Sequence, residues 1–244
     1  MIKNKNLIRL NNYISKSGIC SRRKADNLIK LNLIKVNGKI INKLGYKVII
    51  NKDVIKYNNK IIKIKKNIYI LFNKPKNCIT TLKDKKNRDN IMNYIPSIYK
   101  KYHIYPIGRL DKNTTGVLLL TNDGNFYKIL THPKYKIKKI YKLFINKNLL
   151  KNDYLKLKKG IKLKEGKIKI KNIILNKNNK KIIILTIYLG WNRIIHRIFN
   201  KLGYKIISLD RINFAGFNKK NINKGKFILL SNNYINYIKN NILK

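Results

Sequence analysis

The chain has 244 residues and a mass of 28.9 kDa, enough for one large domain or two small ones, and its 58 Lys and Arg against nine Asp and Glu give a net charge of +49. With 44% hydrophobic and 27% charged residues, the chain is not a disordered basic tail. It has neither the roughly 18 consecutive apolar residues of a membrane helix nor the apolar core of a signal peptide. Cys20 and Cys78 stand alone, which excludes zinc fingers and disulfide scaffolds and favours a cytoplasmic protein that binds polyanions and no metal.

Residues 1–62 are predicted to form a small domain that opens with two helices. Apolar residues recur at helical spacing over residues 7–14, and Gly18 ends this helix. Ser21 is the expected N-cap of a second helix over residues 22–31, because its hydroxyl can accept a hydrogen bond from a free amide of the first turn.

Short strands complete this small domain. Residues 34–41 alternate apolar and polar side chains around Asn37-Gly38, which is a strong hairpin signal. Two further strands are expected around Val48 and Val54. The lysine-rich segment 63–67 is the expected boundary with the next domain.

The second domain, residues 68–244, is predicted to be rich in strands. Its expected strands cover residues 69–72, 104–110, 115–121, 139–145, 167–175, 181–189 and 205–211. Its expected helices cover residues 153–159, 194–202 and 231–242. Strands and helices are interspersed without regular β-α-β units, so we predict an α+β fold with a mainly antiparallel mixed sheet flanked by helices.

Arginine carries more information than lysine in this chain. The abundance of Lys, Asn and Ile, with only two Ala, is typical of A+T-rich codons, so part of the positive charge is attributable to codon drift. Lysine can replace arginine where only charge matters, but not where a planar fork is needed. Eight arginines are present, and they cluster in the segments that look most like motifs: Arg9, Arg22, Arg23, Arg88, Arg109, Arg193, Arg197 and Arg211.

The segments 9–26 and 34–39 resemble the S4 RNA-binding domain. Ser21-Arg-Arg-Lys24 places three cations at a helix N-terminus, which itself favours phosphate, although an ordinary charged helix surface is the alternative interpretation. RNA is favoured over DNA because no groove-reading recognition helix is evident. The resemblance implies RNA contacts at Arg9, Ser21, Arg22, Arg23, Lys24, Lys35, Asn37 and Lys39.

A carboxylate stands out in the segment 106–124, PIGRLDKNTTGVLLLTNDG. Asp111 follows Arg109, whose charge favours an ionised carboxylate that can act as a nucleophile or a base. This run resembles the catalytic motif of the RsuA/RluB branch of pseudouridine synthases, which act on ribosomal RNA. The resemblance continues through residues 71–75, 131–142 and 190–216, and so covers nearly the full length.

The resemblance implies roles for individual residues. Asp111 matches the aspartate that starts cleavage of the glycosidic bond of uridine, and Tyr141 matches the tyrosine that lies against the target base and assists proton removal. Arg109 matches an arginine that contacts RNA near the extruded nucleotide. No metal or organic cofactor is implied. The similarity is greater to the large-subunit branch, so we expect the substrate to be large-subunit ribosomal RNA, free or in an assembling particle. We also expect the protein to be a monomer.

One position departs from the family pattern. His196 stands where most members have the Arg or Lys that pairs with the catalytic aspartate. An imidazole of pKa about 6.5 is mostly neutral at pH 7, but we expect a neighbouring Asp111 to raise the pKa of His196. Arg193 and Arg197 flank it and are the alternative cationic partners, with Arg193 also a candidate for RNA contacts.

Two alternative functions involve no enzymatic activity. The first is an S4-type RNA-binding or ribosome-assembly factor whose catalytic domain has decayed, an idea prompted by the drifted composition and His196. Asp111 and Tyr141 are both present, which argues against decay. The second, a dedicated ribosomal protein, leaves the motif-bearing domain without a purpose.

Overall fold

The computed structural model describes residues 6–243, and contacts divide the chain into two compact units. The first unit extends to Ile68 and also includes Pro96–Tyr105. The second comprises Tyr69–Ile95 and continues from Pro106. No sequence pattern predicted that residues 96–105 would join the first unit, where Lys65 Nζ donates a hydrogen bond of 2.7 Å to the Lys101 carbonyl. The predicted division into domains at residues 1–62 and 68–244 stays a prediction.

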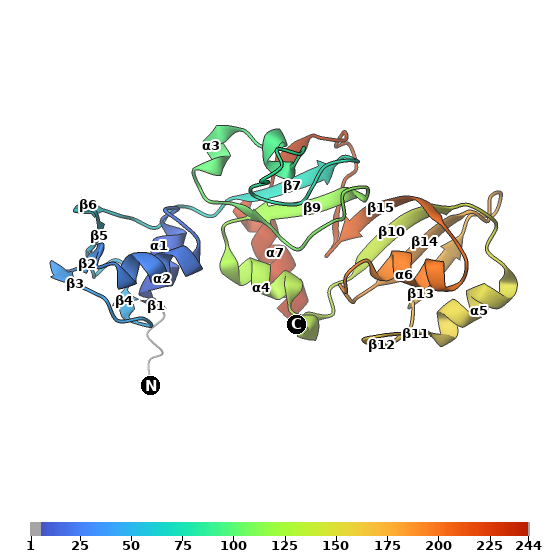
Figure 1. Ribbon diagram of the computed structural model, residues 1–244, viewed down its shortest axis with the longest axis horizontal. Helices are drawn as coiled ribbons and strands as arrows, with labels where there is room; N and C mark the ends of the chain where they lie inside the picture. The colour runs from blue at the N-terminus through green and yellow to red at the C-terminus, as the bar shows by residue number, and fades with distance from the viewer. Residues whose placement is uncertain (1–5, 244) are drawn as a thin grey trace. The chain divides into compact units, whose positions relative to one another are not determined.

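The first unit, in the part that the structure describes, combines three helices with short strands around a small apolar core. Its elements are β1 (Leu7–Arg9), α1 (Leu10–Lys16), α2 (Arg22–Lys30), β2 (Ile34–Val36), β3 (Lys39–Ile40), β4 (Lys47–Ile49), β5 (Ile55–Tyr57), β6 (Lys60–Ile61) and α3 (Ser97–Lys100) (Figure 1). The four-stranded sheet has the order β3-β2-β5-β6, and β1 pairs with β4. The core is formed by Leu10, Ile14, Ala25, Ile29, Ile34, Val48 and Ile55.

Two predictions for this unit are confirmed and one is wrong. Ser21 caps α2 by accepting a hydrogen bond from Lys24 N, and Asn37-Gly38 turns the hairpin with positive φ at both residues. Leu7, predicted to be helical, lies in β1 opposite Ile49. The helix begins only at residue 10, because the preceding backbone is extended and bonded to β4.

The second unit is built on a mixed sheet. Its main strands are β7 (Tyr69–Lys74), β9 (Thr115–Thr121), β10 (Lys139–Ile145), β13 (Asn172–Leu175), β14 (Ile182–Ile187), β15 (Ile206–Phe214) and β17 (Phe227–Leu229), in the order β13-β14-β10-β15-β9-β7-β17, with the short β16 (Phe217–Asn218) beside β15. Every neighbouring pair in this order is antiparallel except β9 with β15. The predicted α+β class and mainly antiparallel mixed sheet are confirmed.

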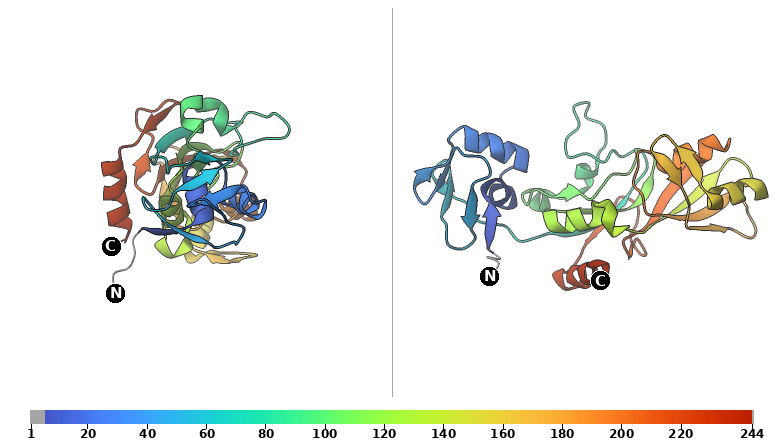
Figure 2. Two further views of the ribbon diagram at one scale, coloured as in Figure 1. Left: turned by 90° about the vertical axis from the view of Figure 1, so that its left-hand side faces the viewer. Right: turned by 90° about the horizontal axis from the view of Figure 1, so that it is seen from below.

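Helices cover this sheet. They are α4 (Gly124–Thr131), α5 (Lys151–Lys159), α6 (Ile194–Lys201) and α7 (Asn232–Leu243), with the 3-10 turns η1 (Ile91–Tyr94) and η2 (Pro133–Tyr135). Helices α4 and α7 pack on one face of β7 and β9, as Figure 2 shows from below, where their apolar side chains meet those of the strands. Beyond α5 a small hairpin, β11 (Ile161–Leu163) and β12 (Gly166–Ile168), contacts α6.

Several predicted boundaries in this unit were wrong for local reasons. The strand expected over residues 104–110 is reduced to β8 (Tyr105–Pro106), because side-chain bonds hold the following segment as a loop. The strand expected over 167–175 is two strands, β12 and β13. Helix α4 was not predicted: Asp123, near the end of the segment 106–124, is its N-cap and accepts hydrogen bonds from two backbone amides.

Candidate active site

A cleft of about 700 Å³ opens in the second unit and brings together most of the predicted catalytic residues. The loop after β8 contributes Arg109 and Asp111, β10 contributes Tyr141, and α6 with the turn before it contributes Arg193 and His196. The segments that bear these residues are far apart in sequence, and the sheet order explains why they meet. Strands β10 and β15 are neighbours, and β15 lies beside β9, which begins directly after the Asp111 loop.

The Asp111 loop is held from both sides by two buried side chains. Thr80 Oγ1 donates to the Leu110 carbonyl at 2.8 Å and accepts from the Leu110 amide at 3.3 Å. Lys74, fully buried at the end of β7, donates to the carbonyls of Lys112 and Thr114 at 3.1 and 2.9 Å. These bonds fix the backbone on either side of Asp111.

Lys74 is an unusual residue to hold this loop, because its charged ammonium is buried and has no contact with water. Burial lowers the pKa of Lys74 from 10.5 to about 8, and the nearby Cys78 and Asp111 only partly offset this effect. The third hydrogen bond of Lys74 Nζ, of 3.0 Å, goes to the Pro75 carbonyl, so among residues 6–243 this ammonium binds carbonyls and no carboxylate.

Gly116 allows β9 and β15 to run parallel at close range just after this loop. Its φ is +105°, and a Cβ atom there would collide with the carbonyl of Arg211. Thr115 and Lys219 both bind Asp210, each at 2.7 Å, which ties the start of β9 to β15. The strands β9 and β15 at the floor of the cleft are therefore held in a fixed position relative to the Asp111 loop.

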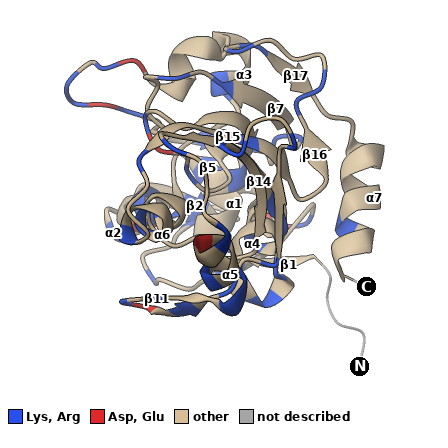
Figure 3. Ribbon diagram, turned by 90° about the vertical axis from the view of Figure 1, so that its right-hand side faces the viewer, with Lys and Arg blue, Asp and Glu red and all other residues tan. Residues whose placement is uncertain are grey.

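Asp111 differs from the other acidic residues in what surrounds it. Figure 3 shows how sparse acidic residues are among the basic ones. Eight of the nine accept hydrogen bonds that hold the fold together: Asp26, Asp53, Asp84, Asp89, Asp123, Asp153, Glu165 and Asp210. Among residues 6–243, none donates a hydrogen bond to the carboxylate of Asp111, which is exposed at the cleft. Its carboxylate is thus free to meet a substrate.

The floor of the cleft also holds residues that sequence reasoning did not assign to the site. Tyr141, 7% exposed, lies opposite Arg211 of β15, which is 3% exposed. Lys139 lies two residues earlier on β10 and therefore on the same face. The available signals were the retention of Arg211 as one of few arginines and the placement of Lys139 at the start of an apolar strand.

His196 lines the cleft, but its predicted electrostatics were wrong. Burial and the charge of Arg193 lower the pKa of His196 below 6.5, and these effects outweigh the opposing influence of Asp111. The side chain is therefore mostly neutral at pH 7, which does not favour its expected role as the cationic partner of Asp111.

The two alternative cations are found in different places. Arg193 is the exposed N-cap residue just before α6, lines the cleft and has a φ of +47°. Arg197 does not line the cleft: its guanidinium forms a bidentate pair with Glu165, with N–O distances of 2.9 and 2.8 Å. Its assignment as a partner of Asp111 is corrected accordingly; it anchors the β11–β12 hairpin to α6.

The residues predicted to contact RNA in the first unit fall into two groups. Arg9, Arg22, Arg23, Lys24 and Lys39 are exposed. The others already have partners in the fold: Ser21 caps α2, Lys35 Nζ donates to Asn59 at 3.1 Å, and Asn37 binds both Asp53 and the Val54 amide.

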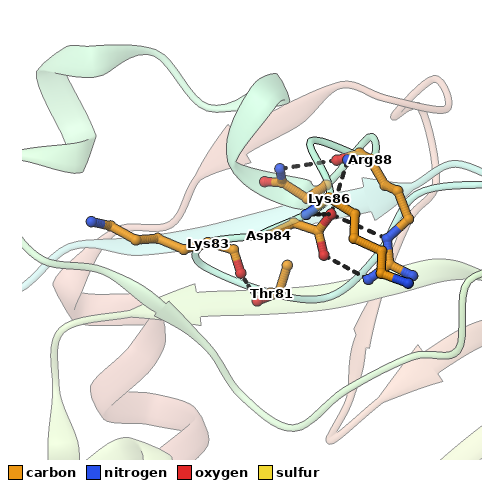
Figure 4. Close-up of polar contacts among 6 residues, drawn as sticks. Thr81, Lys83, Asp84, Lys86 and Arg88 are labelled. Atoms are coloured by element: carbon orange, nitrogen blue, oxygen red, sulfur yellow. Dashed lines mark hydrogen bonds and ion pairs between the residues drawn. The ribbon is translucent and has the colours of Figure 1, made fainter.

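A loop at the rim of the cleft was missed entirely. Thr81 and Leu82 line the cleft, and the segment that follows extends away from the sheet in both views of Figure 2. Figure 4 shows that Asp84 organises it, accepting from the Arg88 guanidinium at 2.7 and 3.1 Å and from two backbone amides. The spacing of an acid and a rare arginine four residues apart was the available signal. The ordered loop presents exposed Lys83, Lys85 and Lys86 to solvent.

Comparison with known proteins gives matches along most of the chain. The RNA pseudouridylate synthase model matches residues 68–201, and the S4 domain model matches residues 8–54. The ribosomal large subunit pseudouridine synthase B of Bacillus subtilis (strain 168) is 40% identical over 221 residues, 89% of each chain. An uncharacterized RNA pseudouridine synthase of Aquifex aeolicus (strain VF5) is 33% identical over 90% of this chain and 89% of its own. A crystal structure of a pseudouridylate synthase matches with a TM-score of 0.65 and 25% identity, covering 95% of this chain and 99% of that one.

Proposed function

The chain belongs to the RNA pseudouridylate synthase family and is a pseudouridine synthase, and we propose that it isomerises one specific uridine of large-subunit ribosomal RNA with Asp111 as the nucleophile. The observation that carries the proposal is the free carboxylate of Asp111, held on a clamped loop in a cleft lined by cations and aromatic rings. The Bacillus relative, named for the large ribosomal subunit, supports the choice of RNA.

The chemistry needs only groups that the cleft contains and the substrate itself. A carboxylate oxygen of Asp111 attacks C1′ of the ribose while the C1′–N1 bond breaks and its electron pair stays on the uracil ring. The ring turns, C5 attacks C1′, and the bond to Asp111 breaks. Loss of the C5 proton, assisted by Tyr141, and protonation of N1 complete an isomerisation in which no atom is gained or lost.

The target base must leave its stack to reach Asp111, at a cost of a few kcal/mol. Binding energy for this step is available from cations on both units. Arg109 and Arg193 lie at the cleft, and exposed Arg22, Arg23 and Lys24 stand at the N-terminus of α2, where the helix dipole also favours phosphate. No helix within residues 6–243 has the length and apolar character needed to span a membrane. We propose a monomer that acts in the cytoplasm.

Asp111→Asn tests the proposal, because it keeps the volume of the side chain and removes its charge and nucleophilic oxygen. Single-turnover conversion of uridine in large-subunit ribosomal RNA fragments or immature particles should vanish, while RNA binding should persist. Asp84→Asn, which changes an acid in the rim loop, is the matched control and should retain conversion. Parent activity retained within about tenfold by Asp111→Asn would reject the nucleophile assignment, since tenfold is only about 1.4 kcal/mol. Absence of conversion by the parent protein would favour the decayed RNA-binding factor.

A further inference from the structure

Two cations lie side by side on the floor of the cleft. Lys139 is on β10 and Arg211 on the neighbouring β15, and both approach the ring of Phe214. The guanidinium carbon of Arg211 lies 4.5 Å from the ring centroid, and Lys139 Nζ lies 6.0 Å from it. All three residues line the same cleft as Asp111.

Neither cation has an acidic partner within residues 6–243. Lys139 Nζ donates to the carbonyls of Ile137 and Tyr188, at 3.2 and 2.9 Å, and Arg211 Nε donates to the Val117 carbonyl at 2.8 Å. Arg211 Nη2 is buried and, among the residues described, has no hydrogen-bond partner. A buried charge without a counterion is costly, and two like charges together raise the cost. Burial and the charge of Arg211 accordingly lower the pKa of Lys139 to about 8.

An arrangement this unfavourable in the free protein fits a site completed by negative charge from the substrate. A backbone phosphate is a poor candidate, because Arg211 is 3% exposed and its guanidinium stacks on the ring of Phe214, whereas Arg109 and Arg193 are exposed at the cleft. A flat uracil ring can lie against such a floor. That ring carries a negative charge once the C1′–N1 bond has broken, shared between N1 and the carbonyl oxygens.

We propose that Lys139 and Arg211 form an anion site that stabilises the detached uracil ring during the reaction. The inference rests on the proposed function and adds to it the groups that meet the leaving base. Both side chains act through charge and hydrogen bonds alone: the electron pair released onto N1 is used again when C5 bonds to C1′, and the carboxylate of Asp111 is regenerated. Fixed charges aimed at developing charge in a site with little water are among the strongest sources of catalysis.

Lys139→Met tests this proposal, with Lys142→Met as the matched control, because Lys142 is an exposed lysine on the same strand. The substrates are one RNA with uridine at the target position and the same RNA with 5-fluorouridine there. Fluorine withdraws electrons and stabilises the ring anion, so the base leaves more easily without help. Since 5-fluorouridine has no C5 proton to lose, the reaction is followed as disappearance of the original N-glycoside in digested RNA.

At saturating RNA, Lys139→Met should lower the first-order rate by about 100-fold on uridine and by about tenfold or less on 5-fluorouridine, with the Kd for RNA nearly unchanged. Arg211→Met should show the same dependence on the leaving base, provided that its unfolding midpoint stays near that of the parent. Equal losses on both substrates would indicate a structural role and overturn the proposal, as would a loss confined to Kd, which would indicate a phosphate site. An inactive parent would refute the proposed function itself, whereas an active parent matched by Lys139→Met would refute only this inference.

Discussion

Lys74→Met removes the ammonium that clamps the Asp111 loop and keeps most of the volume of the side chain. The pKa of Lys74 is about 8 in place of 10.5. Relative to the neutral amine, the protonated side chain is therefore about 3 kcal/mol less favourable in the fold than in the unfolded chain. Its three hydrogen bonds to carbonyls recover free energy of about the same size, at roughly 1 kcal/mol each. The two effects nearly cancel, so this lysine contributes position rather than stability.

Lys74→Met should therefore change the free energy of unfolding by less than about 2 kcal/mol in either direction. Conversion should fall about 100-fold, because a shift of about 1 Å in a catalytic group has a cost of this order. The Kd for RNA should hold, since Lys74 is fully buried. Denaturant unfolding, single-turnover conversion and RNA titration measure the three quantities, with the exposed Lys76→Met as the control. A conversion rate within threefold of the parent, together with a stability loss of more than about 3 kcal/mol, would refute the positioning argument.

Three further predictions concern the pH dependence of stability, the charge of His196 and the cations at the start of α2. Stability should rise between pH 8 and 10.5, because the unfolded chain then binds more protons than the fold does at Lys74, and urea unfolding of Lys74→Met should show a weaker rise. Conversion should not fall as pH rises from 7 to 8, since the lowered pKa leaves His196 mostly neutral in that range; a fall abolished by His196→Arg would contradict the lowered pKa. Joint replacement of Arg22, Arg23 and Lys24 by Gln should weaken RNA binding and reduce the slope of log affinity against log salt by about two, and an unchanged slope would exclude phosphate contacts there.

The sequence was sufficient for elements whose signals are local. Ser21 and Asn37-Gly38 carry their capping and turn chemistry within four residues, and the residues 115–121 and 139–145 were predicted as strands with the observed limits. Helix α4 was missed because its signal, the Asp123 N-cap, also reads as a turn. Residues 107–110 were taken for the end of a strand because the bonds that hold them and the following residues as a loop come from Thr80 and Lys74, about 30 to 40 residues away.

The catalytic site was predicted in the same uneven way. Asp111 and Tyr141 belong to motifs that are contiguous in sequence, and both were found in the cleft. The pKa of His196 was predicted with the wrong sign, because Asp111 was considered without the burial and the Arg193 charge that oppose it. Arg197 was a candidate by proximity along the helix, but its actual partner, Glu165, lies 32 residues away on a hairpin that sequence reasoning did not detect.

The contacts of individual arginines show why arginine carries more information than lysine in this chain. Arg88 and Arg197 each grip a carboxylate with two nitrogens, and Arg211 stacks on Phe214 while donating to a carbonyl. These are tasks for a planar fork that the ammonium of lysine cannot perform. Arg109 and Arg193, in contrast, meet no acid among the residues described and lie exposed at the cleft. In a chain where lysine supplies charge so abundantly, a free arginine at the cleft has no structural reason to be there. Its fork is best explained by a planar or bidentate partner outside the protein, and a phosphate or base edge of RNA is such a partner.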